Sequence, residues 1–424
     1  MNSKPDLDRL IPRAGTGSVK WEYREGAVGH GSTLVPADDP DVIPMWVADM
    51  DFPCPEVVTE AIRRRAEHPI FGYSMGLPSY REAFCDWSAA RHGFRPDPAW
   101  VVPTEGIVPD LGLLVRTLIE PGQGVILHPP VYFPFFGAVR NGGGRMRLCP
   151  LRREDGPAAG GRNPYRLDLE RFEKLAAEPG TRMTFLCTPQ NPVGRVWTPG
   201  ELTVFSRIAA RHDLIVIADE IHGDLMLDGR KFTPWLGLEH PPGLRSVVCS
   251  AASKTFNLAG LKSSCLVIPD EEMRAAYQHA RDRTGVYGVN PLSGAAAEAA
   301  WRGGAPWLDE VLAYVSENVR TVRDFFRERP ELNVGAVPVE GTYLAWLDFR
   351  RTGIEPGALE DFLLDKAKLR LEDGAIFGEE GRGFARMNLA CPRPLLTEAL
   401  GRLEAALRST SPARKARPLP KVRP

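Results

Sequence analysis

Four short apolar runs constrain the fold of this 424-residue chain more than any other feature. They cover residues 125–127, 183–187, 214–218 and 247–249. Apolar runs of this kind, here interrupted only by Thr184, are typical of strands that are buried on both faces. A helical pattern, residues 200–212, returns the chain between the second and third runs. The pattern predicts an α/β fold with a mostly parallel sheet.

Each run is followed by a residue that can do chemistry. Tyr132 follows the first run, Asn191 the second, Asp219 the third and Lys254 the fourth. Ligands of doubly wound sheets bind at the carboxyl ends of the strands. We therefore expect these four side chains to border one site.

Lys254 lies among small residues, in a stretch that allows a flat ligand to approach the backbone. An amine attacks an aldehyde to form a Schiff base only when the amine is neutral, so such a site must lower the lysine pKa by burial or by a neighbouring cation. The alternative is an ordinary solvated lysine.

Asp219 ends an apolar strand, where a carboxylate is costly unless it meets a cation. A protonated pyridine nitrogen is such a cation. His222 lies three residues further on, and an Asp and a His at this spacing could also bind a metal ion. However, no third or fourth His or Cys ligand has suitable spacing. We expect no metal.

The order of four motifs resembles the fold-type I pyridoxal-phosphate enzymes of the class I/II aminotransferase superfamily. The motifs are Asn-Pro-x-Gly at 191–194, Asp-Glu at 219–220, Ser-Lys-Thr-Phe at 253–256 and a late arginine, Arg386. The similarity extends from about Met45 to Arg393, and the run 46–52, Trp-Val-Ala-Asp-Met-Asp-Phe, is similar to the cystathionine β-lyase or cysteine-S-conjugate lyase branch.

The resemblance implies that Lys254 is the catalytic lysine and that the cofactor is pyridoxal 5'-phosphate. It implies cofactor contacts from Gly106, Ile107, Val108, Tyr132, Asn191, Asp219, His222, Ser253, Lys254, Lys262 and, from the neighbouring subunit of a homodimer with shared sites, Tyr73. It implies substrate contacts from Arg386, Asn191, Trp46 and Ala48.

Three positions depart from the superfamily's pattern. His222 stands where a tyrosine is usual, Lys262 replaces an arginine and Ala251 replaces a serine. Lysine would meet a phosphate as a point charge rather than as a planar fork.

The N-terminal segment around Asp49 and Asp51 has two readings. It is an arm that packs on a core, or its two carboxylates form a metal site or an acid/base pair. We favour the arm, because no histidine and no pair of cysteines lies nearby.

Composition excludes several classes of protein. The formal net charge of −1 argues against a nucleic-acid surface. The first 18 residues have no apolar signal region, no run approaches a membrane span, and the seven cysteines show no Cys-x-x-Cys spacing. We expect a cytoplasmic enzyme with free thiols.

The chain is expected to divide into an N-terminal arm (1–55) that belongs to the small domain, a large cofactor-binding domain (56–292), a small C-terminal α/β domain (293–410) and a disordered basic tail (411–424). Residues 152–164, rich in Arg, Gly and Pro, predict an exposed loop.

The expected activity is a carbon–sulfur β-lyase that acts on cystathionine or another cysteine S-conjugate, a small amino acid. Alternatives are an aminotransferase and a specialised biosynthetic enzyme that acts on an S-conjugated cysteine, with or without decarboxylation. A non-catalytic regulatory module conflicts with intact Lys254, Asp219 and Arg386. A nicotinamide dehydrogenase conflicts with the lack of Gly-x-Gly-x-x-Gly after the early strands.

Overall fold

A seven-stranded sheet forms the centre of the computed structural model, which describes residues 5–28, 31–36, 39–75, 78–154, 162–286 and 288–410. The strand order is β4-β12-β11-β10-β9-β5-β6. The strands are β4 (Val101–Thr104), β5 (Gly124–Leu127), β6 (Arg145–Leu148), β9 (Thr181–Cys187), β10 (Ile215–Asp219), β11 (Ser246–Ser250) and β12 (Ser264–Val267). Only the pairs that involve β12 are antiparallel within this sheet. The expected α/β class and mostly parallel sheet are confirmed.

Both faces of the sheet are covered, which explains the apolar runs. In β5, Val125 and Leu127 pack into one core cluster and Ile126 packs into the other. The first cluster takes side chains from α4 (Ile107–Leu118), α5 (Pro134–Asn141) and α9 (Glu271–Asp282). The second takes side chains from α6 (Leu169–Ala177) and α7 (Pro199–Arg211), where Phe172 and Phe205 stack with ring centroids 4.3 Å apart. A strand buried on both faces has no polar side to alternate with.

Helix boundaries follow local capping. In α7, the Thr198 side chain accepts from the Glu201 N–H, and Glu201 accepts in return from the Thr198 N–H. Helix α3 (Pro78–His92) ends before Gly93, which has φ +73°, a left-handed conformation that glycine adopts readily at a helix end. The remaining helices of this half are α1 (Val19–Glu22), α2 (Glu56–Glu67), α8 (Ala252–Thr255) and α10 (Pro291–Gly303).

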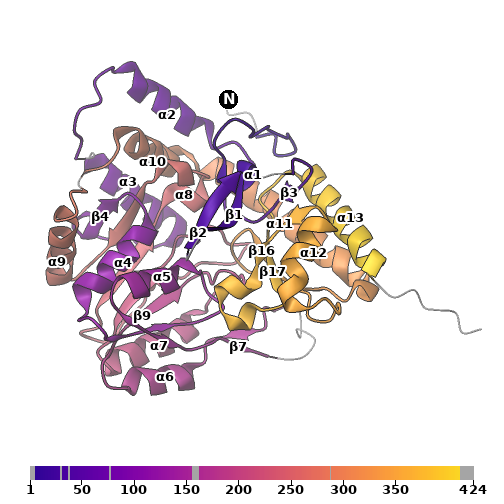
Figure 1. The fold of residues 1–424 in the computed structure, drawn as a ribbon. Helices are drawn as coiled ribbons and strands as arrows, with labels where there is room; N and C mark the ends of the chain where they lie inside the picture. Colours follow the sequence, from indigo (N-terminus) through magenta and orange to yellow (C-terminus); the bar gives the residue numbers. More distant parts are fainter. Residues whose placement is uncertain are drawn as a thin grey trace, which may run out of the picture.

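A second sheet lies in the C-terminal third, to the right of the large sheet in Figure 1. Its antiparallel order is β13-β14-β17-β16, from β13 (Gly335–Ala336), β14 (Leu344–Asp348), β16 (Glu372–Asp373) and β17 (Phe384–Asn388). Helices α11 (Ala305–Arg327), α12 (Leu359–Asp365) and α13 (Arg393–Thr410) belong to the same third.

The N-terminal arm is joined to this C-terminal third by backbone pairing. Strand β3 (Ile43–Pro44) lies parallel to β15 (Leu369–Arg370), and the Asp51 N–H donates to the Ala390 carbonyl. Within the arm, β1 (Tyr23–Val28) pairs antiparallel with β2 (Gly31–Pro36). The proposed domain boundaries remain a prediction.

One sequence expectation is wrong in part. Residues 152–164 are not simply an exposed loop: β7 (Arg152–Arg153) pairs with β8 (Tyr165–Arg166), and Asn163 is fully buried. Its amide donates to the carbonyls of Val193 and Pro338, because a buried backbone carbonyl needs a donor. Residues 155–161 and the basic tail 411–424 lie outside the described residues.

All seven cysteines are free, and six of them are buried. No helix in the described ranges is long and apolar enough to cross a membrane.

Candidate active site

A cavity of about 220 Å³ lies where the carboxyl ends of the central strands meet the N-terminal arm and the second sheet. Its lining consists of Trp46, Val47, Ala48, Ile107, Val108, Tyr132, Phe133, Cys187, Asn191, Asp219, Ile221, His222, Lys254, Glu372 and Arg386. The four residues expected at the strand ends, Tyr132, Asn191, Asp219 and Lys254, therefore do border one site.

Lys254 enters the cavity from α8, directly after β11. Its Nζ donates to the Ala48 carbonyl oxygen at 2.6 Å. Burial lowers the lysine pKa to about 8, the positive charge of Arg386 acts in the same direction, and Asp49 and Asp219 oppose it. About a tenth of the amine is thus neutral at pH 7, and a nucleophile or base requires this neutral form.

Asp219 is the last residue of β10 and is 4% exposed. Its Oδ1 accepts from the Ile221 N–H at 3.1 Å. Burial raises the pKa of this carboxyl to about 6, against that hydrogen bond and the attraction of Lys254. Among the described residues, no Lys, Arg or His nitrogen lies within ion-pair distance of Asp219. The carboxylate is therefore suited to a cation that the chain itself does not provide.

Arg386 lies in β17, between β14 and β16, and is 2% exposed. Its Nη1 donates to Asn191 Oδ1 at 3.1 Å, and its Nη2 donates to the Trp46 carbonyl at 2.9 Å and to Glu372 Oε2 at 3.1 Å. Arg386 is therefore not an edge charge, because β17 has a neighbouring strand on each side.

The N-terminal arm is held over the cavity by hydrogen bonds to its backbone. Tyr343 donates its hydroxyl to the Ala48 carbonyl at 2.9 Å, beside the Lys254 bond to the same oxygen. The Asn388 amide donates to the carbonyls of Val47 and Asp49 at 2.7 and 2.6 Å. Three side chains from distant parts of the chain thus position the residues that line one wall.

The two arm carboxylates are held in ion pairs. Asp51 contacts the buried Lys20 Nζ at 2.6 Å and Arg13 at 3.1 Å, and Asp49 contacts Arg13 at 2.8 Å. The favoured reading of this segment as a packed arm is confirmed. Among the described residues, no group of three or more His, Cys, Asp or Glu side chains is arranged to hold a metal ion.

Tyr132 and His222 are the cavity's titratable rings. Burial raises the Tyr132 pKa to about 12 and lowers the His222 pKa well below its usual value, so both are neutral. The His222 Nδ1 is buried without a hydrogen-bond partner among the described residues. Such an atom is available to a polar group of a ligand.

Four of the expected contact residues do not line this cavity. Gly106 precedes α4 and borders an adjoining cavity that shares Val108 and Phe133 with the first. Ser253 is half-buried beside Lys254, and Lys262 is exposed in a left-handed turn at φ 51°.

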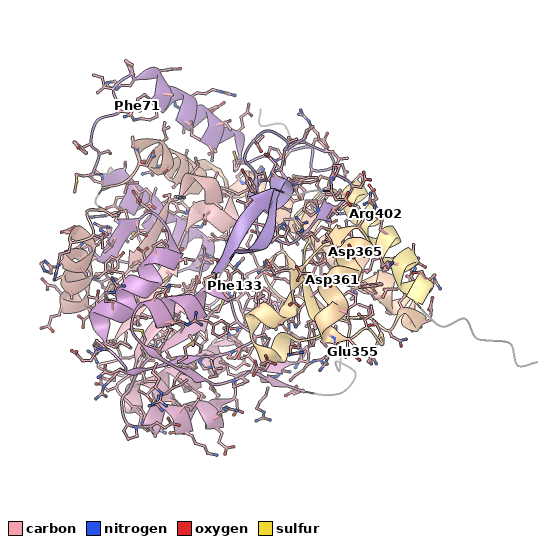
Figure 2. The ribbon with its side chains drawn as sticks, in the orientation of Figure 1. Phe71, Phe133, Glu355, Asp361, Asp365 and Arg402 are labelled. Carbon is pink, nitrogen blue, oxygen red and sulfur yellow. The ribbon has the colours of Figure 1, made fainter. Side chains whose placement is uncertain are left out.

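Tyr73 is the fourth, and its side chain is 99% exposed. In Figure 2, Phe71, two residues earlier, lies at the outer edge of the molecule beside α2, well away from the cavity residue Phe133. The chain does not bring this segment into its own cavity.

The sequence did not identify several residues of the site. These are Tyr343, Glu372 and Asn388, which bond to site residues, and the lining residues Val47, Phe133, Cys187 and Ile221. The only sequence signal near Glu372 was the alternation of apolar residues 369 and 371 with charged residues, which is typical of a strand. This pattern does not indicate which cation the carboxylate contacts.

Comparison with known proteins gives matches over nearly the whole chain. The family model described as aminotransferase class I and II matches residues 40–403. Cystathionine beta-lyase PatB of Bacillus subtilis is 38% identical over 95% of this chain and 100% of its own length, and protein MalY of Escherichia coli is 32% identical over 95% and 99%. The crystal structure of cystalysin from Treponema denticola, which contains a pyridoxal 5'-phosphate cofactor, is 33% identical, with a TM-score of 0.87 over 96% of this chain and 99% of that one.

Proposed function

This chain belongs to the aminotransferase class I and II family, and from that premise we propose that it is a pyridoxal-phosphate-dependent carbon–sulfur β-lyase. Its substrate is cystathionine or another cysteine S-conjugate, and its products are a thiol, pyruvate and ammonia. The observation that carries the proposal is the meeting of Lys254, Asp219 and Arg386 in one cavity.

The residues present fit the cofactor. Asp219 is a buried carboxylate that lacks a cation, and the protonated pyridine nitrogen is a cation. The His222 Nδ1 without a partner is available to the ring hydroxyl, and Tyr132 presents an aromatic ring for stacking. The phosphate is assigned to the N-terminus of α4 at Gly106, Ile107 and Val108, with Ser253 and Lys262 as further donors. When bound, pyridoxal phosphate acts as an electron sink for a negative charge that forms at the substrate Cα.

Lys254 moves the proton. In the cofactor-free chain its Nζ has a pKa of about 8 and donates to the Ala48 carbonyl. As a neutral amine it takes the proton from the substrate Cα. Departure of the thiolate from Cβ leaves aminoacrylate, which hydrolyses to pyruvate and ammonia.

Arg386 and Asn191 hold the substrate carboxylate. A guanidinium recognises a carboxylate through two parallel N–H bonds, and the Asn191 contact to Nη1 keeps its plane in place. Trp46 and Ala48 border the substrate on the arm side, while the apolar side chains of Val108, Phe133 and Ile221 keep water from the reacting carbon.

We further propose a cytoplasmic homodimer in which Tyr73 reaches the cofactor phosphate of the partner subunit. The exposure of Tyr73 supports this arrangement, as does the position of Phe71, two residues earlier, at the outer edge of the molecule in Figure 2. The division into arm, large domain and small domain belongs to the same proposal.

The decisive experiment supplies the purified protein with pyridoxal phosphate and an S-substituted cysteine such as cystathionine. We expect thiol, pyruvate and ammonia in equal amounts without any keto-acid acceptor. If turnover needs an acceptor and the nitrogen is recovered in a new amino acid, the protein is an aminotransferase. If carbon dioxide accompanies the thiol, the decarboxylating alternative holds.

A further inference from the structure

The carboxylate of Glu372 lies on the guanidinium of Arg386, the group to which the proposed function assigns the substrate carboxylate. The two residues are direct cross-strand partners in β16 and β17. Glu372 Oε2 lies 3.1 Å from Arg386 Nη2, and the exposed fractions of the two side chains are 10% and 3%. The pair is buried, and both residues line the cavity.

The donors of Arg386 can be counted. A guanidinium carries five N–H groups: one on Nε and two each on Nη1 and Nη2. Both Nη2 hydrogens are used, by the Trp46 carbonyl and by Glu372, and Nη1 uses one of its two on Asn191. The buried Nε has no partner among the described residues. The donors that remain are on Nε and Nη1.

These two remaining donors do not belong to one fork. A carboxylate that binds with two parallel hydrogen bonds uses either Nη1 with Nη2 or Nε with Nη2. Both forks include Nη2. A bidentate substrate carboxylate must therefore take an Nη2 hydrogen from an acceptor that already holds it.

Of the two acceptors on Nη2, Glu372 is the one that an incoming anion displaces. The Trp46 carbonyl is fixed in the arm, whose neighbouring carbonyls are held by Asn388. Glu372 is a side chain with rotatable bonds, and its negative charge repels a second carboxylate that approaches the same guanidinium.

We propose that Glu372 is an internal competitor for the substrate carboxylate, and that substrate binding at Arg386 displaces it. The residue also explains how the chain tolerates a buried guanidinium, because Glu372 supplies its counter-charge. Glu372 thus stabilises the fold at the expense of substrate affinity. The inference rests on the proposed function only in that this cavity receives an α-amino acid.

The test uses the cofactor-loaded protein and Glu372→Gln, which preserves the shape and a neutral acceptor but removes the charge. The probes are L-alanine, which has no leaving group at Cβ, and ethylamine, the same molecule without its carboxylate. Affinities are measured by titration calorimetry. We expect the variant to bind L-alanine about tenfold more tightly than the wild type does, because a neutral acceptor holds Nη2 more weakly and repels no anion. Ethylamine affinity should stay the same.

The matched control is Glu379→Gln. Glu379 is also paired with an arginine, Arg382, at 3.7 Å, but its side chain is 83% exposed. This variant should bind L-alanine as the wild type does.

Thermal unfolding separates competition from a purely structural role. Glu372→Gln should unfold at a lower temperature than the wild type, and saturating L-alanine should raise its unfolding temperature more than it raises that of the wild type. Lower stability with unchanged or weaker L-alanine binding makes Glu372 a structural partner of Arg386 and overturns the inference.

A variant that fails to fold is replaced by Glu372→Asp, whose shorter side chain draws the carboxylate away from Nη2. This variant should also bind L-alanine more tightly, and an unchanged affinity overturns the inference. If the wild type does not bind L-alanine at all, the proposed function fails instead, which is a different result.

Discussion

Replacing Asp219 with asparagine should stabilise the cofactor-free protein and weaken its binding of pyridoxal phosphate. The carboxylate is 4% exposed, has no ion-pair partner among the described residues and has a pKa of about 6 because of burial. The substitution keeps the side-chain oxygen that accepts from the Ile221 N–H and removes the charge. The same substitution therefore raises the stability of the cofactor-free protein and lowers its affinity for the cofactor.

The size of the effect follows from the pKa. A rise from 3.8 to about 6, at roughly 1.4 kcal/mol per pKa unit, makes ionised Asp219 cost the folded protein about 3 kcal/mol at pH 8. Because the folded pKa lies above the unfolded one, this cost is fully present above about pH 6 and disappears as the pH falls toward about 4. The new amide adds two buried N–H donors without partners. They destabilise the variant by about 1–2 kcal/mol and offset part of the gain. The net stabilisation is about 1–2 kcal/mol.

The assay is urea unfolding of the cofactor-free wild type and Asp219→Asn at pH 8, with cofactor affinity measured by absorbance titration. We expect a higher midpoint for the variant and cofactor binding that is about 10–100-fold weaker, as for the loss of a charge-assisted contact. Asp213→Asn is the control, since that side chain is 69% exposed and should alter neither quantity. A variant less stable than the wild type at pH 8 would refute the reasoning, because the carboxylate would then be satisfied within the chain.

Four further predictions concern the same site. Lys254→Ala should abolish turnover and the borohydride-reducible attachment of the cofactor, and a reducible adduct in the variant would show that another lysine is the reactive one. In the cofactor-free wild type, Lys254 should react with an amine-acylating reagent with a half-maximal rate near pH 8, because burial lowers its pKa; a midpoint near the ordinary value of 10.5 contradicts this. Arg386→Ala should weaken amino-acid binding by about 2–4 kcal/mol and leave cofactor binding intact, as judged by calorimetry. Mixing inactive Lys254→Ala with an inactive Tyr73 variant should partly restore activity after subunit exchange, since one site of each mixed dimer is then intact; no recovery, with exchange confirmed by mass spectrometry, places Tyr73 outside the partner's site.

Local features of the sequence, together with the family resemblance, were enough to predict most elements and ten of the fifteen residues that line the cavity. In helix α2 (Glu56–Glu67), for example, apolar positions recur at helical spacing, and a proline and a charged residue mark its start. Asp219 and Lys254 were identifiable because each follows a buried strand at the edge where such sheets bind ligands.

The rest of the site depends on contacts that no local pattern encodes. Asn388 holds carbonyls of the arm about 340 positions earlier in the chain, and Tyr343 bonds to Ala48 across 295 positions. Asn163 is buried in a stretch whose composition is that of a loop, because two distant carbonyls need its amide. These side chains donate hydrogen bonds to backbone carbonyls, and the sequence does not indicate which carbonyls are buried.

Buried charged residues that support the fold have an ion-pair partner within the chain, whereas those that we assign to the reaction lack a fixed one among the described residues. Asp51 is buried, but Lys20 and Arg13 neutralise it within hydrogen-bond distance, so its charge is fully used in attaching the arm. Asp219 is equally buried and has no such partner, and Lys254 is held by a carbonyl rather than by a carboxylate. An uncompensated buried charge lowers stability, and inside a cavity it is suited to a ligand that supplies the missing partner. Arg386 is intermediate, since Glu372 neutralises it but can be displaced, and this is why the substrate carboxylate is expected to compete with a side chain of the protein itself.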